Sequence, residues 1–223
     1  GNPIEIPTIK IEKVQDNKEL ENEIKNLKDY TYLVLTSKNG VDIFFDKLDE
    51  IGLDCRALAN IKVCSIGAAT SKAIIRRGIK PDIQPEKAVG ESLYDELKDI
   101  VSKEDKILIP RAKNAREFLV KKLNEISNVT EVVTYESVMD DSKKEEAISA
   151  LEEGNLDYIT FASSSTVTNF INLIGEENKD KLSNTKIISI GKITTKTILD
   201  NGLEVYKESE KASIESMIEA MSE

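Results

Sequence analysis

The chain has 223 residues, a formal net charge of −10 and no histidine. Hydrophobic residues make up 39% of it and charged residues 32%, which indicates a folded globular protein rather than a disordered one. The negative charge disfavours a general nucleic-acid binder, because such proteins need a basic face. The lack of histidine excludes Ser-His-Asp and Cys-His nucleophile schemes and most zinc sites. Acid–base chemistry would have to use Tyr, Lys, Asp, Glu, Ser or water.

Membrane and export signals are missing from the sequence. No apolar run is long enough to span a bilayer, and the first residues lack the basic and then apolar pattern of a signal peptide. Cys55 and Cys64 do not have the spacing of metal ligands and are interpreted as reduced thiols. We therefore expect a cytoplasmic protein that binds neither membranes nor a metal.

Strands and helices are predicted to alternate along the chain. Short runs rich in Ile, Leu and Val predict buried parallel strands at 32–36, 62–66, 106–109, 158–162 and 186–190. Helical spacing of apolar residues follows in four segments, 40–51, 68–77, 116–126 and 192–201. Gly52, Gly78 and Gly202 stand where a helix would end. The alternation predicts an α/β fold, with parallel sheets flanked by helices on both faces.

The second half of the chain repeats the first. Residues 61–97 align without a gap to residues 185–221, so that Gly67 matches Gly191. Thirteen of these 37 positions are identical, where composition alone would give roughly two or three. The sequence therefore predicts an internal duplication.

The duplication predicts two similar lobes joined by a two-stranded β linker. The expected boundaries are 1–9 with 138–223 for lobe one, 13–131 for lobe two, and 10–12 with 132–137 for the linker strands. The strand at 106–109 and the helix at 116–126 have no counterpart, since it would precede residue 1. A first β-α unit is therefore expected to be missing: the natural protein would begin about twenty residues earlier, or belong to a longer or fused chain.

Four predicted strands end in turns rich in small and hydroxylated residues that lead directly into a helix. Ligands of open parallel sheets bind at this edge, where helix N-termini favour anions. Simple helix capping by Ser and Thr is the alternative for each turn. Together the four turns predict a carboxylate- or phosphate-binding cleft shared by both lobes. The candidate residues are Thr36, Ser37, Lys38, Asn39, Gly67, Ala68, Thr70, Ser71, Ser163, Ser164, Ser165, Gly191, Lys192 and Thr194.

Two further residues are candidates for the site. Arg111 follows the strand at 106–109, where it could pair with a ligand carboxylate or form a surface salt bridge. Tyr135 lies in the second linker segment, where its phenol could donate a proton to a ligand or simply pack. A dinucleotide or NTP site is disfavoured, because neither G-x-G-x-x-G nor G-x-x-x-x-G-K-[ST] occurs.

These segments together resemble the uroporphyrinogen-III synthase family. The resembling segments follow the family's order over nearly the whole chain: LVLTSKNGV (33–41), SIGAATSK (65–72), ILIPRA (107–112), TYESV (134–138), DYITFASSSTVTNF (157–170) and SIGKITTKTILDNGL (189–203). The resemblance implies two α/β lobes with a β linker and a cofactorless lyase of tetrapyrrole biosynthesis. Its substrate would be hydroxymethylbilane, an octacarboxylate that loses water and closes with inversion of ring D.

The resemblance also implies roles for individual residues. Tyr135 would assist departure of the hydroxyl group, and Thr70 and Thr194 would hydrogen-bond the substrate. Lys192-Ile193 departs from the family's usual turn. We expect a monomer without a cofactor, with possible fusion to, or channelling from, another enzyme of the pathway.

Two other function classes remain open. The first is a two-lobed binding or regulatory module of the same fold without catalysis, and the second is a flavodoxin-like interaction domain. A receiver domain is disfavoured because no acidic cluster follows a first strand, and a periplasmic binder is disfavoured by the missing signal peptide.

Overall fold

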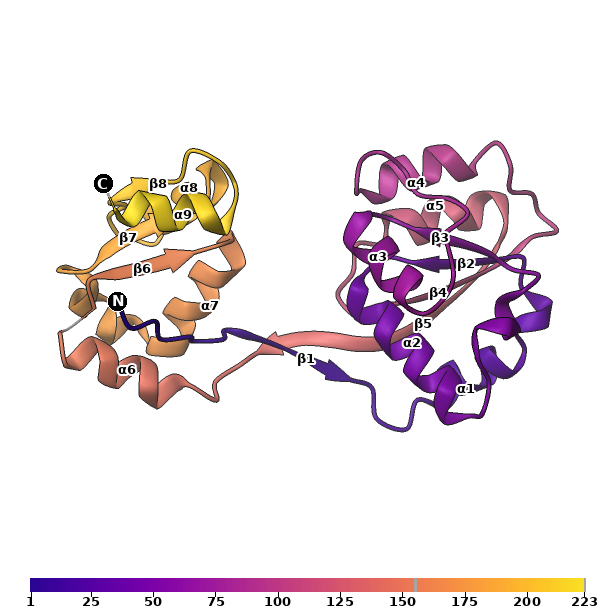
Figure 1. Ribbon diagram of the computed structural model, residues 1–223, viewed down its shortest axis with the longest axis horizontal. Helices are drawn as coiled ribbons and strands as arrows, with labels where there is room; N and C mark the ends of the chain where they lie inside the picture. The colour runs from indigo at the N-terminus through magenta and orange to yellow at the C-terminus, as the bar shows by residue number, and fades with distance from the viewer. Residues whose placement is uncertain (155, 223) are drawn as a thin grey trace. The chain divides into compact units, whose positions relative to one another are not determined.

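The computed structural model describes residues 1–154 and 156–222, and the chain divides into two compact units (Figure 1). Unit 1 comprises Gly1–Lys10 and Val138–Glu223, and unit 2 comprises Ile11–Ser137. The two units are described separately below.

Unit 2 is built on a twisted sheet with the strand order β1-β5-β4-β2-β3. Strand β2 pairs in parallel with β3 and β4, and β4 pairs in parallel with β5. The strands are β1 (Ile9–Lys13), β2 (Tyr32–Leu35), β3 (Lys62–Ser65), β4 (Lys106–Ala112) and β5 (Asn128–Met139).

Helices cover both faces of this sheet, so alternate residues of one strand enter different cores. Leu33 and Leu35 of β2 pack with α1, α2 and α3, whereas Tyr32 and Val34 pack with α4 and α5. Burial on both faces explains why the strands are continuous apolar runs rather than alternating ones. The helices are α1 (Lys18–Lys25), α2 (Lys38–Glu50), α3 (Ala68–Arg76), α4 (Gly90–Leu97) and α5 (Phe118–Ile126), with short 3₁₀ helices at Leu27–Asp29 and Cys55–Leu58.

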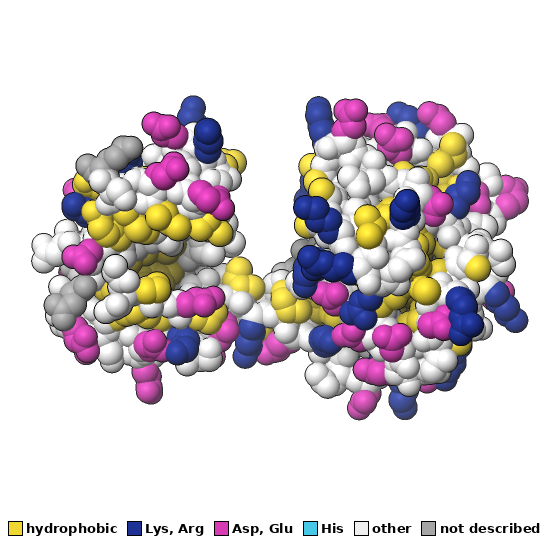
Figure 2. All heavy atoms as spheres, viewed as in Figure 1, with side chains coloured by type: hydrophobic (Ala, Val, Ile, Leu, Met, Phe, Trp, Pro, Cys, Tyr) yellow, Lys and Arg dark blue, Asp and Glu magenta, His cyan; other side chains and the backbone are white. Residues whose placement is uncertain are grey.

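Unit 1 has a smaller parallel sheet, in the order β6-β7-β8. Its main core lies against α6, α7 and α8, while a small cluster around Ile188, Met217 and Ala220 lies against α9. Figure 2 shows hydrophobic side chains over α9, where Ile214 and Ile218 are more than half exposed. The elements are β6 (Tyr158–Phe161), β7 (Lys186–Ser189), β8 (Lys207–Glu208), α6 (Lys144–Glu152), α7 (Ser164–Ile174), α8 (Lys192–Asp200) and α9 (Ile214–Met221), with a 3₁₀ helix at Glu176–Leu182.

The α/β class and the parallel strands expected from the sequence are confirmed. All five predicted strands begin at the predicted residue, and Gly52, Gly78 and Gly202 end their helices with φ of 78°, 90° and 76°. Helix α5 begins at Phe118, so the predicted start at Arg116 was wrong; residues 113–117 form the turn that leaves β4. Strand β8 has two residues and carries no sequence pattern that predicts it. Within residues 1–154 and 156–222, no helix is long and apolar enough to cross a membrane.

Leu108 offers a test of the unit 2 core, because it is fully buried on β4, between β5 and β2. We expect Leu108→Ala to lower the free energy of unfolding by about 2–5 kcal/mol, through lost transfer free energy and a cavity. Ile75→Ala, at a side chain that is 51% exposed, should change it by less than about 0.5 kcal/mol. Urea denaturation followed by circular dichroism measures both, and equal midpoints would contradict this packing.

Candidate functional site

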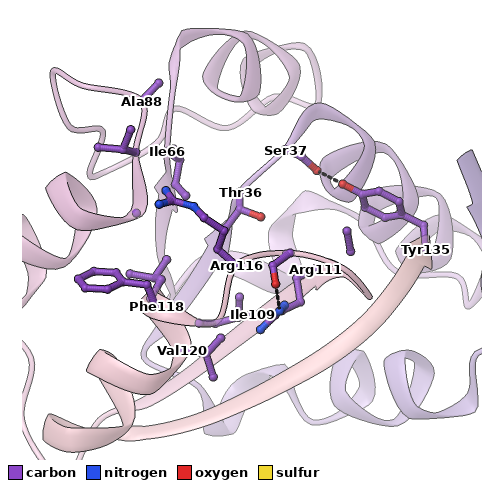
Figure 3. Close-up of a pocket in the computed structure, with 15 residues that line it drawn as sticks. Thr36, Ser37, Ile66, Ala88, Ile109, Arg111, Arg116, Phe118, Val120 and Tyr135 are labelled. Atoms are coloured by element: carbon purple, nitrogen blue, oxygen red, sulfur yellow. Dashed lines mark hydrogen bonds between the residues drawn. The ribbon is translucent and has the colours of Figure 1, made fainter. Parts of the chain in front are cut away.

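A cavity of about 290 Å³ opens at the carboxyl edge of the unit 2 sheet (Figure 3). Its wall comes from the ends of β2, β3 and β4, from β5, and from the N-terminus of α4. Parallel strands bring their carboxyl ends to one edge, which is where ligands of open α/β sheets bind. The lining residues are Thr36, Ser37, Ile66, Ala88, Val89, Gly90, Ile109, Arg111, Ala112, Ala115, Arg116, Phe118, Leu119, Val120 and Tyr135.

Two hydroxyl groups meet in this cavity. The Tyr135 Oη lies 2.7 Å from Ser37 Oγ, and Figure 3 shows the phenol directed at the serine. Ser37 is the N-cap of α2, and its Oγ accepts the backbone N–H of Gly40 at 2.9 Å. The serine oxygen accepts the Gly40 N–H, and the serine hydroxyl can donate its own proton to the Tyr135 oxygen. In that arrangement the phenolic proton of Tyr135 is available to a ligand.

A β-bulge determines where Tyr135 lies. The β4–β5 register shifts between Arg111, which pairs with Val133, and Ala112, which pairs with Tyr135. Thr134 is the extra residue, and its buried Oγ1 donates to the Arg111 carbonyl at 3.2 Å. Bulges re-aim side chains next to binding sites, and this one puts Tyr135 opposite the end of β4. The Tyr135 carbonyl accepts the Lys113 N–H at 2.8 Å, which fixes the strand beyond the bulge.

Arg111 is only 4% exposed, lines the cavity and forms an ionic cluster with two half-exposed carboxylates. Its guanidinium donates to Glu131 Oε2 at 2.8 Å, to Glu117 Oε1 at 2.6 Å and to the Ala115 carbonyl at 2.6 Å. The guanidinium beside it lowers the pKa of Glu117 below its ordinary value. The arginine therefore joins β5 to the loop between β4 and α5, and its salt-bridge role is the one the geometry favours over direct contact with a ligand.

Gly67 lets the loop before α4 approach the end of β3. A Cβ placed on Gly67 would lie 2.8 Å from the Ala88 Cβ, which is too close for any other residue without movement. Ala88 lines the cavity beside Val89 and Gly90. Gly67 thus shapes the wall from behind rather than lining it.

The other predicted residues of unit 2 do not line this cavity. Thr70 and Ser71 are buried in the first turn of α3, whereas Lys38 and Ala68 are exposed and Asn39 is half-buried. The Ser71 Oγ donates to Gln84 Oε1, so Ser65, whose Oγ lies 2.6 Å away, donates to Ser71. The Ser71 hydroxyl is thereby used inside the protein, where it fastens α3 to β3.

Unit 1 has the same arrangement at equivalent residues. Ser189 Oγ lies 2.5 Å from Thr195 Oγ1, which donates to Glu208 Oε2 at 2.5 Å. Ser189, Thr195 and Glu208 each stand 124 residues after Ser65, Ser71 and Gln84. We refer to each set of three as a hydroxyl clasp.

The predicted residues of unit 1 lie in the turns after β6 and β7. Ser163 caps α7 in a capping box with Thr166, and its Oγ lies 2.9 Å from Ser165 Oγ; Ser164 is the first residue of α7. Thr194 is buried in the first turn of α8, Lys192 is exposed, and a Cβ on Gly191 would meet nothing within 4 Å. Capping is thus realised at Ser163, as it is at Ser37.

Sequence reasoning missed part of the cavity wall. Val89 and Gly90 enter from α4, and Phe118 and Leu119 enter from the start of α5. The basic character of residues 111–116 was visible, but no pattern in the sequence favoured Arg116 over Arg111 as the group exposed at the cavity. Arg116 is 67% exposed and donates to both carboxylate oxygens of Glu91, at 2.8 and 3.1 Å.

The fold and cavity define an α/β protein with parallel sheets and a hydroxyl-lined, arginine-bearing site at the carboxyl ends of its strands. A family model described as uroporphyrinogen-III synthase HemD matches residues 1–219. The chain therefore belongs to the uroporphyrinogen-III synthase family.

Relatives support this assignment over the full chain. The porphyrin biosynthesis protein HemD of Ruminiclostridium josui is 33% identical over 225 residues, which cover 100% of this chain and 44% of that protein. The uroporphyrinogen-III synthase of Synechococcus elongatus is 26% identical, over 98% of this chain and 84% of that protein. The chain thus spans less than half the length of the first relative and most of the second.

Solved structures show the same fold. A mutant uroporphyrinogen III synthase from the extremely thermophilic bacterium Thermus thermophilus matches with a TM-score of 0.61 and 18% identity, over 97% of this chain and 86% of that one. The enzyme from Helicobacter pylori matches with a TM-score of 0.61 and 19% identity, over 96% of this chain and 90% of that one.

Arg111 should stabilise unit 2 mainly through its hydrogen bond to the Ala115 carbonyl and less through its two ion pairs. Arg111→Met should lower the free energy of unfolding of unit 2 by about 1–3 kcal/mol, because the Ala115 carbonyl loses a buried donor; the half-exposed carboxylates add less. A carboxylate whose pKa is lowered in the folded state stabilises the fold above its unfolded pKa, and this contribution is lost as the pH falls through its folded-state pKa. The ordinary pKa of Glu117 is 4.5. The difference in free energy of unfolding between wild type and variant should therefore become smaller as the pH falls below 4.5. Urea titrations at pH 7 and pH 3.5 measure this, and a constant gap would count against the pairing.

Proposed function

We propose that this chain is a uroporphyrinogen-III synthase that closes hydroxymethylbilane, with loss of water and inversion of ring D. The observation that carries the proposal is the Ser37–Tyr135 hydroxyl pair, which lies at the sheet edge of a chain belonging to this family. The cavity of about 290 Å³ is near the lower end of ligand sites. It would therefore hold one part of the linear tetrapyrrole rather than the whole molecule.

The first chemical step would be departure of the terminal hydroxyl group. The C–O bond breaks with the electron pair on oxygen, the Tyr135 phenol supplies a proton, and water departs, which leaves an azafulvenium cation and a tyrosinate. Ser37, with Gly40 N–H on its own oxygen, would donate to the Tyr135 oxygen as negative charge develops there.

Ring closure would depend on conformation more than on further acid–base chemistry. The methylene carbon of the azafulvenium cation is attacked by ring D at its substituted position, and a spiro intermediate then rearranges to the inverted ring. A site that holds the two ends of the flexible chain together uses binding energy to offset the entropy lost on bringing them together, so the ring-closing step no longer bears that cost. The proton taken from Tyr135 is recovered from the product pyrrole, so no cofactor or oxidant enters the balance.

The turns of unit 1 belong to the proposal as further contacts for the same substrate. Ser163, Ser164, Ser165, Gly191, Lys192 and Thr194 supply hydroxyls, backbone amides and one ammonium group at helix N-termini, which suit carboxylates. Thr36, Lys38, Asn39, Ala68 and Thr70 would play this part in unit 2.

A non-catalytic binding module of the same fold is the second candidate. The named relatives are synthases, and a binding module has no need of a paired phenol and serine. The synthase is therefore preferred. A cytoplasmic location, a monomeric state and fusion to another pathway enzyme remain predictions.

An isomer assay separates the two candidates. Hydroxymethylbilane made enzymatically is given to the chain, and the products are resolved after oxidation by chromatography. We expect the type III isomer, whereas spontaneous closure gives type I. A folded chain that yields only the type I isomer would refute the synthase.

Tyr135→Phe tests the acid. Removing the phenolic proton should lower kcat for type III formation by about 100-fold, the lower end of what general acids contribute. Thr70→Ala, which removes one hydrogen bond, should cost less than about tenfold. If both variants lose the same factor, Tyr135 has no special part in the reaction.

Ser37→Ala tests the donor to Tyr135. It should slow the wild type by about tenfold but have little further effect in Tyr135→Phe, because both changes break one interaction; Ser37→Thr should retain most of the rate. The lost cap should also cost about 1 kcal/mol of stability. Ser213→Ala removes a serine N-cap of the same kind from α9 and serves as the matched control, with similar destabilisation and an unchanged rate. Additive losses in the double variant would contradict the coupling.

A further inference from the structure

Arg116 and Glu91 form an ion pair at the cavity that the mechanism above does not use. Arg116 belongs to the turn between β4 and α5, and Glu91 belongs to the first turn of α4. The two guanidinium nitrogens Nη1 and Nη2 each donate to one oxygen of the Glu91 carboxylate, at 2.8 and 3.1 Å. Figure 3 shows the Arg116 side chain extending across the cavity toward Ile66 and Ala88.

We infer that Arg116 binds a carboxylate of the substrate, and that Glu91 occupies this position until the substrate arrives. A planar guanidinium pairs with carboxylates through two parallel hydrogen bonds, and the Glu91 contact has this two-bonded form. A substrate acid group is chemically the same partner. The inference rests on the proposed function, because it takes a polycarboxylate as the ligand.

The exchange is energetically easy in this location. Both side chains are well exposed, 67% for Arg116 and 44% for Glu91. Exposed ion pairs contribute little net stability, because water competes for both groups. Replacing one carboxylate by another is therefore close to neutral, and a substrate that gains further contacts in the cavity displaces Glu91.

Two other cations of the same strand and turn do not suit this role. Arg111 is buried, and its donors are directed to Glu131, Glu117 and the Ala115 carbonyl. Lys113 pairs with Glu136 at 2.9 Å and does not line the cavity. Arg116 thus combines exposure, a place on the wall and a partner that a substrate can replace.

The pairing also gives Glu91 a defined effect on specificity. While Glu91 is paired with the Arg116 guanidinium, a neutral ligand gains no binding free energy from the arginine. A ligand with a single carboxylate and few other contacts gains little. A ligand whose acid group is presented by a ring already seated in the cavity gains most. Glu91 would therefore favour polycarboxylates over simple acids.

Binding of uroporphyrin I, a stable octacarboxylate macrocycle, tests the inference without turnover. Kd is measured by titration calorimetry at fixed ionic strength for wild type, Arg116→Gln, Glu91→Gln and the double variant. We expect Arg116→Gln to raise Kd about tenfold, equivalent to about 1.4 kcal/mol, and Glu91→Gln to lower it about threefold. The double variant should match Arg116→Gln, because Glu91 acts only through the arginine.

Lys113→Gln is the matched control, since it removes the same charge from the same loop. Its Kd should stay within about twofold of the wild type, and all variants should keep the wild-type melting temperature. A Kd for Arg116→Gln equal to that of Lys113→Gln would overturn the inference. A Kd for Glu91→Gln that is equal to or higher than the wild-type Kd would also overturn it.

The isomer assay separates this inference from the proposed function. A chain that forms the type III isomer, but whose KM for hydroxymethylbilane is unaffected by Arg116→Gln, remains a synthase and overturns the role of Arg116. A chain that gives only the type I isomer overturns the proposed function, whatever the Kd values are.

Discussion

The buried guanidinium of Arg111 is the contact on which the candidate site depends. It is held from three directions, by Glu131 of β5 and by Glu117 and the Ala115 carbonyl of the turn after β4. A buried charge is tolerated only when it is paired and hydrogen-bonded, so these partners stabilise the fold as well as shaping the site. The turn they hold carries Arg116, and the strand they hold carries Tyr135. One structural ion cluster thus fixes the positions of both residues to which we assign chemistry.

The β-bulge beside this cluster has a complementary effect. An unbroken β4–β5 ladder would place Thr134, rather than Tyr135, opposite Ala112. Because successive side chains of a strand point to opposite faces, a shift of one residue exchanges which side chain faces the cavity. The phenol therefore reaches Ser37 because of a local irregularity in the sheet, and the buried Thr134 hydroxyl, bonded to the Arg111 carbonyl, holds that irregularity in place.

Much of this architecture follows from the sequence, and the part that does not has a physical reason. Buried runs such as Leu33–Leu35 could be recognised because both sheet faces are covered. The gathering of Thr36, Ser37 and Arg111 was expected from parallel strands that end at one edge, whereas Tyr135, inside β5, was expected only in the linker. The bulge leaves no mark in composition, and the Arg116–Glu91 pair joins residues 25 positions apart through side-chain geometry alone. For the same reason the sequence suggested Arg111 as the ligand-binding cation, although its charge is already satisfied inside unit 2.

The two hydroxyl clasps differ at two positions, Thr195 for Ser71 and Glu208 for Gln84, and the second difference has an electrostatic consequence. In unit 2 the clasp ends on the neutral amide of Gln84, whereas in unit 1 it ends on the carboxylate of Glu208 beside the first turn of α8. A negative charge there offsets the positive end of the helix dipole, whereas Lys192 adds a positive charge to the same turn, where α3 has Ala68. The duplicated turns therefore present different arrangements of charge at equivalent helix N-termini.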